Sequence, residues 1–312
     1  MTGRPLLRLV VAGAAARLAY SALQARPPGG SPTWDRTNHR SEPVTLLEGP
    51  AAAIGATAAA LAVPGLPARQ RLALAVAGAG AGAFGCYDDL AGSGDRRGLR
   101  GHLGALAKGE VTTGAIKIIG IGATGLAAGL LLGAPGARGG ARGAAGPAGR
   151  TLDLMIDTGL VAGTANLINL FDLRPGRAIK VSLLAGAGLA VTGTKGTAPV
   201  AAPAGAVLAL LPPDLAERAM LGDAGANAVG AMLGVGLAAA LPRPVRLVAL
   251  AGIAGLTLVS EKVSFTKVIA RTPALNWLDL LGRRPPAATA RPAATAAPAG
   301  PVPAAEPAPA GR

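Results

Sequence analysis

The chain has 312 residues, of which 51% are hydrophobic and only 2% aromatic, and its 30 Lys and Arg residues against 16 Asp and Glu residues give a formal charge of +14. A mean hydropathy of +0.45 is too high for an ordinary soluble domain of this length and is typical of a protein with several membrane spans. The single Cys86 excludes an intrachain disulfide, and with only two histidines in the chain the sequence argues against a structural zinc site.

Apolar stretches follow one another along the chain and predict an all-α fold, a polytopic membrane helical bundle of about nine transmembrane helices. The first stretch also resembles a secretory signal peptide, but Arg17 inside it and the many later spans favour an uncleaved helix. The abundant Gly and Ala residues suit helices that pack closely. The predicted spans are residues 6–23, 50–63, 72–84, 111–132, 152–170, 178–191, 198–211, 226–241 and 245–259.

Residues 80–85 match the pattern G-x-G-x-x-G of dinucleotide-binding turns. No strand precedes this match and it lies inside a predicted span, so a nucleotide site is not the favoured interpretation. Gly78 and Gly82 stand four residues apart, on one face of a helix. We therefore expect these small residues to serve helix packing.

The basic residues lie mainly in short loops between the apolar stretches, which favours contact with lipid headgroups over binding of nucleic acid. Loops that follow the odd-numbered spans carry about twice as many Lys and Arg residues as the other loops. The positive-inside rule then places the N-terminus outside and the C-terminus in the cytoplasm of a bacterial plasma membrane. Residues 1–284 would form the membrane domain, and the Pro/Ala-rich residues 285–312 a disordered cytoplasmic tail.

Acidic and amide residues gather at three of the predicted cytoplasmic span ends. An acidic pair at a bilayer edge is costly, and a divalent cation is the simplest reason for its presence, because Mg²⁺ takes oxygen ligands from one or two carboxylates and from substrate phosphates. We therefore expect the three clusters to converge on one site. They are Asp88 with Asp89, then Asn166, Asn169 and Asp172, and finally Asp223 between Gly222 and Ala224.

These motifs, in this order, resemble those of the polyprenyl-phosphate phosphoglycosyltransferases. That family loads phospho-muramoyl-pentapeptide or N-acetylglucosamine phosphate onto undecaprenyl phosphate. The resemblance covers about residues 1–284 and includes a first-loop segment, residues 38–49, with a basic residue, a Pro and a Gly. It implies a Mg²⁺-dependent enzyme of cell-wall biogenesis, including peptidoglycan synthesis, that uses a nucleotide sugar, with UDP expected as the nucleotide, and a polyprenyl phosphate among membrane lipids. The resemblance does not decide whether the protein forms a homodimer.

The resemblance also implies roles for particular residues. Asp88, Asp89 and Asp223 would be catalytic and would form the metal environment, although the motif does not decide which aspartate binds the cation. The expected substrate-binding residues are Asn166, Asn169, Asp172, Lys108, Lys117, Arg174, Arg177 and Arg40.

Several positions depart from the family pattern. Pro175 stands where the third-loop motif D-G-x-D-G has its second aspartate, Glu48 replaces a Gly, and Ala226 stands where a Ser is usual. Residues 261–269 lack the His-rich motif, and a tenth span is missing. A catalytically degenerate member that binds polyprenyl phosphate or scaffolds envelope assembly therefore remains an alternative. A transporter is a third hypothesis, and it is weakened because the two halves of the sequence show no inverted repeat.

Overall fold

The structure is a computed structural model that describes residues 3–92, 101, 104–105, 107–133 and 146–285. Within these ranges nine helices of 14 or more residues each overlap one predicted span, so the mainly helical class is confirmed. The predicted tail from residue 286 onward, residues 93–100, 102–103 and 106 of the basic loop expected at 92–110, and residues 134–145 of the loop expected at 134–150 lie outside the described residues. The long helices are α1 (Gly3–Ala25), α3 (Glu48–Ala62), α4 (Ala68–Ala91), α6 (Thr113–Gly133), α7 (Pro147–Phe171), α8 (Arg177–Ala190), α9 (Thr194–Leu215), α10 (Gly222–Ala240) and α11 (Arg243–Ser260).

Six of the described helices, α1, α6, α7, α9, α10 and α11, are long and apolar enough to cross a membrane. Helices α3 and α8 have 15 and 14 residues, fewer than the ~20 that a span of ~30 Å needs. Large apolar side chains point outward from the bundle, as Leu18 on α1, Met155 on α7 and Val248 on α11 do. That outward pattern is typical of helices that face lipid rather than water.

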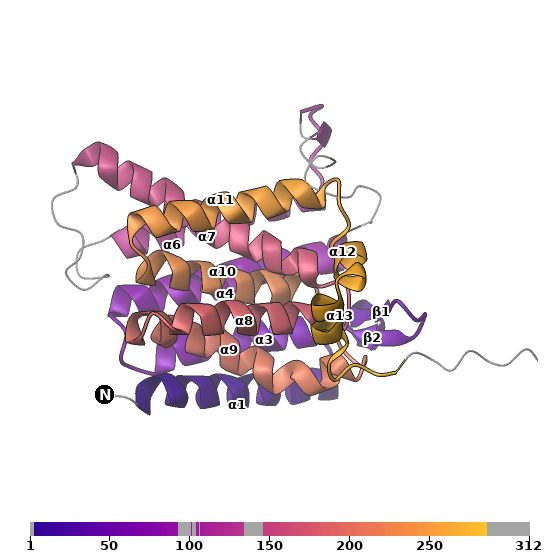
Figure 1. Cartoon of the computed structure of the whole chain (residues 1–312). Coiled ribbons are helices and arrows are strands. Elements are labelled where there is room, and N and C mark those ends of the chain that lie inside the picture. Colours follow the sequence, from indigo (N-terminus) through magenta and orange to yellow (C-terminus); the bar gives the residue numbers. More distant parts are fainter. Residues whose placement is uncertain (1–2, 93–100, 102–103, 106, 134–145, 286–312) are drawn as a thin grey trace, which may run out of the picture.

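The long helices lie side by side, with α10 at the centre of the bundle and α1 and α11 at its edges (Figure 1). Helix α10 packs against α4 and α7 most extensively, while α1 packs on α3 and α9 and α11 packs on α7. Successive long helices alternate in direction. We call the end of the bundle at which α4 ends and α6 and α10 begin the site end, and the end near the N-terminus the far end (Figure 1).

Close packing depends on small residues. A Cβ atom at Gly205 of α9 would lie 2.0 Å from the carbonyl oxygen of Leu9 on α1, and one at Gly85 of α4 would lie 2.2 Å from the carbonyl oxygen of Asp223. Gly82 faces Ala53 of α3 and Ala228 of α10. The prediction that the glycines near residues 80–85 serve helix packing is therefore confirmed.

Short elements at the site end amend the all-α prediction. The loop expected after the first span contains α2 (Ser31–Trp34) and an antiparallel pair, β1 (Asp35–Thr37) and β2 (Pro43–Thr45). Their turn is closed by Asn38, whose Oδ1 accepts hydrogen bonds from the backbone N of Arg40 at 2.8 Å and of Glu42 at 2.9 Å. After α11, α12 (Phe265–Arg271) and α13 (Pro273–Leu280) fold against the same end (Figure 1).

Candidate functional site

Two of the predicted catalytic carboxylates meet across a lysine at the site end. Asp88 lies near the end of α4, Asp223 in the first turn of α10, and Lys117 in the second turn of α6. The Nζ of Lys117 is 2.5 Å from Oδ2 of Asp88 and 2.5 Å from Oδ2 of Asp223. The structure thus brings together residues that are 135 positions apart, because three helices end or begin at the same level.

Asp89, the neighbour of Asp88, is directed at the backbone of α10. Its Oδ1 accepts a hydrogen bond from the backbone N of Asp223 at 3.0 Å, and its Oδ2 accepts one from the N of Ala224 at 2.9 Å. The first N–H groups of a helix have no partner within the helix, and a carboxylate is favourable there. Asp89 therefore holds the start of α10, and with it Asp223, against the end of α4.

Glycines permit this close approach. Gly222 has a φ of +58°, in the left-handed region that favours glycine, and a Cβ atom there would lie 3.0 Å from Asp89 Oδ2. Gly85, one turn before Asp89, lies against the main chain of Asp223. The sequence Gly222-Asp223-Ala224-Gly225 thus does more than supply a carboxylate, because Gly222 lets Asp89 approach the start of α10.

The third predicted cluster divides between two places. Asn166 donates from Nδ2 to the Oγ1 of Thr257 on α11 at 3.3 Å, which is a contact between helices. Asn169 is half-buried, and its carbonyl oxygen accepts a hydrogen bond from the backbone N of Asp172. Asp172 is buried and accepts a hydrogen bond from the backbone N of Gly222, so it also lies beside the start of α10. Burial, followed by the nearby Asp214 carboxylate, raises the pKa of Asp172 well above its usual value.

Sequence reasoning missed three further buried acids at this end, Glu48, Asp214 and Glu217. Each has at least one carboxylate oxygen without a hydrogen-bond partner in the described part of the chain, as does Asp172. Asp214 Oδ1 accepts a hydrogen bond from the backbone N of Gly176 at 2.7 Å, so its carboxylate lies against the turn that contains Pro175. The sequence singled out Glu48 only as a departure from the family pattern and gave none of the three a role in the site, because isolated acids usually face solvent.

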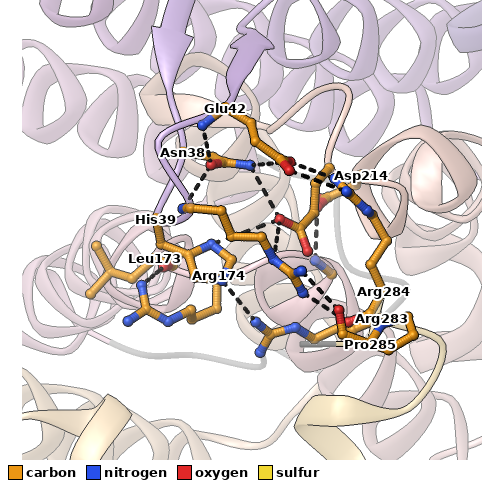
Figure 2. A network of polar contacts seen from close by, with 12 residues as sticks. Asn38, His39, Glu42, Leu173, Arg174, Asp214, Arg283, Arg284 and Pro285 are labelled. Carbon is orange, nitrogen blue, oxygen red and sulfur yellow. Dashed lines mark hydrogen bonds and ion pairs between the residues drawn. The ribbon is translucent and has the colours of Figure 1, made fainter. Parts of the chain in front are cut away.

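A cavity of about 320 Å³ opens beside these acids, between the turn after β1, the turn from α7 to α8 and the connection from α9 to α10. Figure 2 shows several of the polar residues around it, and the residues that line it include Asn38, His39, Asp172, Arg174, Asp214 and Glu217. Burial and the nearby Arg174 guanidinium lower the pKa of His39. The cavity therefore has carboxylates on its walls and basic groups beside them.

Two of the predicted substrate-binding arginines hold the C-terminal segment instead. Arg177 is buried and forms two hydrogen bonds, of 2.7 and 3.1 Å, to the carboxylate of Asp279 on α13. The Nε of Arg40 lies 3.0 Å from Oε2 of Glu217, and its guanidinium donates to the carbonyl oxygens of Arg284 and Pro285. These two guanidiniums thus stabilise the site end.

The remaining predicted cations lie elsewhere. Arg174 lines the cavity and donates to the carbonyl oxygen of Leu173. Lys108 is exposed in the turn ahead of α6. Of the predicted cations, Lys117 is the one that the described contacts place between the carboxylates of Asp88 and Asp223.

The carboxylates of Asp88 and Asp223 are suitable ligands for a magnesium ion whose remaining coordination positions are filled by oxygens of a substrate phosphate. Their carboxylates already share one cationic group, the ammonium of Lys117, and carboxylate oxygens are the ligands that Mg²⁺ prefers. Among the described residues no group of three or more His, Cys, Asp or Glu side chains is arranged to hold a metal by itself. A cation here would therefore need water or phosphate oxygens in addition.

No protein-family model matches this chain, and no curated protein matches it either. The resemblance described from the motifs therefore rests on those motifs and on where the structure places them.

Proposed function

We propose that this chain is a membrane-embedded, Mg²⁺-dependent transferase that moves a sugar 1-phosphate from a UDP sugar to a polyprenyl phosphate. The observation that carries this proposal is the meeting of Asp88 and Asp223 around one cationic group, with Asp89 fixing the start of α10 beside them. A pair of carboxylates that gathers positive charge suits transfer of a phosphoryl group, in which negative charge must be stabilised.

For this transfer the protein needs mainly to position the two substrates and to stabilise negative charge. An oxygen of the lipid phosphate attacks the sugar-bearing phosphorus, and the bond from that phosphorus to the oxygen of the departing UMP breaks. A phosphate monoester loses its second proton near pH 6, so the acceptor is largely ionised at neutral pH. A divalent cation, when bound, would neutralise charge on the diphosphate oxygens. Asp88 and Asp223 would hold it, and Lys117 would lie beside the phosphates.

The membrane arrangement is part of the proposal. All nine long helices would lie in a bacterial plasma membrane, with the N-terminus outside and the site end facing the cytoplasm. Six apolar helices, outward-pointing apolar side chains and the excess of basic residues in the loops at the site end support it. A water-soluble nucleotide sugar and a lipid phosphate could then meet at the membrane surface.

The test is transfer by the purified full chain in lipid nanodiscs, supplied with labelled UDP sugars, undecaprenyl phosphate and Mg²⁺. We expect a labelled lipid product that Asp88→Asn or Asp223→Asn abolishes. An absence of product with a panel of nucleotide sugars, or a product that neither substitution affects, would contradict the proposal.

A second function, binding of polyprenyl phosphate without transfer, is favoured by one feature of the structure and two of the sequence. Lys117 already neutralises the carboxylate pair, Pro175 replaces an aspartate of the family motif, and residues 261–269 contain no His. Saturable binding of undecaprenyl phosphate with no turnover of any donor would support this function over the transferase.

A further inference from the structure

Lys117 occupies the position that a bound cation would take. Both carboxylate oxygens lie 2.5 Å from the same Nζ, so they are at most twice that distance apart. A magnesium ion held by both would lie about 2.0–2.1 Å from each oxygen, close to where the ammonium now lies. An ammonium and a divalent cation cannot share this point, because their charges repel at such short range.

We infer that Lys117 is an internal counter-ion that closes the Asp88–Asp223 pair in the free protein and must withdraw before a divalent cation can bind there. The inference rests on the proposed function for the identity of the metal site. It makes Lys117 a positioning residue that sets how weakly the site holds a cation before substrate arrives.

The surroundings identify Lys117 as the member of the group that can move. Asp89 is held by two backbone N–H groups, and Asp223 lies in the first turn of the helix that those bonds anchor. Lys117 is attached through a flexible four-carbon stem, and its side chain is 17% exposed, so it has a route to the surface. Arg177 shows the contrasting case, since its planar guanidinium is locked to both oxygens of Asp279.

The withdrawal would couple cation binding to substrate binding. A cation that competes with a built-in ammonium binds weakly alone, and phosphate oxygens that attract both the cation and the displaced ammonium favour the exchange. Lys117 would thereby change partners from carboxylate to phosphate, without any change in its charge.

The experiment measures Mn²⁺ binding to the full chain in nanodiscs without substrate, by the loss of the free-ion electron paramagnetic resonance signal. We expect Lys117→Met and Lys117→Gln each to bind Mn²⁺ at least about tenfold more tightly than the unsubstituted chain, because the competing charge is gone. Lys117→Arg keeps the charge and should show no such gain. Lys195→Met, which removes an exposed lysine at the far end, is the matched control for net charge and should leave the affinity unchanged.

A second measurement checks that the variants are folded and that the same carboxylates are involved. Without metal, Lys117→Met should unfold at a lower temperature than the unsubstituted chain, because two carboxylates then face each other. Mn²⁺ should raise the unfolding temperature of Lys117→Met by more than it raises that of the unsubstituted chain. The double variant Asp88→Asn with Lys117→Met should lose the tight binding.

The outcomes separate this inference from the proposed function. If both uncharged variants bind Mn²⁺ no more tightly than the unsubstituted chain, or no variant binds it, the inference is wrong. If the affinity rises as expected but no donor is ever turned over, the inference stands and the transferase proposal fails. Transfer that depends on Asp88, without any gain in affinity on losing Lys117, would leave the transferase standing and reject the inference.

Discussion

The two ends of the bundle both contain buried acids and bases, but they combine them in opposite ways. At the far end, Asp153 and Asp157 of α7 face Arg243 and Arg246 of α11, and the guanidinium of Arg246 bridges the two acids at 2.7 and 2.5 Å. At the site end, the carboxylates of Asp88 and Asp223 share one lysine, and further acids nearby have oxygens without partners in the described chain.

Under the proposed function, the far end serves stability and the site end serves a ligand. The far-end network pairs two aspartates with two arginines, and the planar guanidinium of arginine matches a carboxylate in two places. This network clamps α11, which otherwise exposes most of its surface, onto α7. At the site end, Asp88 and Asp223 instead share a single lysine, a point charge on a flexible stem that can leave. Buried polar groups are nearly always paired, and the unpaired atoms at the site end include oxygens of four carboxylates, which favours a cationic or hydrogen-bonding ligand there.

The largest expected effect tests the functional side of this comparison. Asp88→Asn or Asp223→Asn should lower the rate of lipid-linked product formation by about 1000-fold or more, because charge stabilisation at the phosphate is lost. At the far end, Asp157→Asn should leave the rate of the folded fraction unchanged. If substitutions at the two ends lowered the transfer rate equally, the functional distinction between the ends would be wrong.

The structural side of the comparison is tested by Arg246→Met. This substitution leaves the buried Asp157 carboxylate without its guanidinium and should lower the free energy of unfolding by about 3 kcal/mol. Adding Asp157→Leu to it should restore most of the lost stability, because the uncompensated charge is then removed as well. Circular dichroism of the two variants during unfolding in detergent measures both changes in the free energy of unfolding. A double variant as unstable as the single one would argue against a stabilising ion-pair network between α7 and α11.

Gly85→Ala tests the contact that brings the site-end acids together. The added Cβ would lie 2.2 Å from the carbonyl oxygen of Asp223, so α4 and α10 must separate, at a cost of about 1–3 kcal/mol and with a loss of transfer activity. Gly122→Ala on α6 is the matched control, since nothing lies within 4 Å of its Cβ position, and it should be neutral or stabilising. Similar behaviour of the two variants would show that the close approach is unimportant.

The smallest expected effect, counted per pH unit, is a change in the pH dependence of stability. Burial raises the pKa of Asp172, so between its ordinary pKa near 4 and its raised value the folded chain binds more protons than the unfolded chain. Stability conferred by this group is therefore present below pH 4 and is lost as the pH rises through the folded pKa. Asp172→Asn should flatten this fall, which can reach about 1.4 kcal/mol per pH unit. Denaturant unfolding at pH 4 and pH 8 checks it, and an unchanged slope would contradict it.

The sequence predicted the helices well, and their ends less well. Each apolar run became a helix, because a backbone in an apolar medium must satisfy its own hydrogen bonds. The predicted third span stopped at Phe84, where the apolar run ends, yet α4 continues through Asp88 and Asp89 to Ala91. Helix hydrogen bonding does not require apolar side chains, so a search for apolar residues ends too early. The short strands near Asn38 were not predicted either, because they depend on local turn contacts and carry no apolar pattern.

By itself, the amino-acid sequence determined that the chain is a bundle of closely packed helices and that its acidic motifs stand at helix ends. Alternation of direction then required motifs at corresponding ends to lie at one level. Only the tertiary structure decided that Asp89 binds backbone and not solvent, that Lys117 lies between Asp88 and Asp223, and that Asp214 lies against the turn containing Pro175. Those roles depend on distances of a few ångströms between segments that are from about thirty to more than a hundred residues apart, and spacing along the chain does not fix such distances.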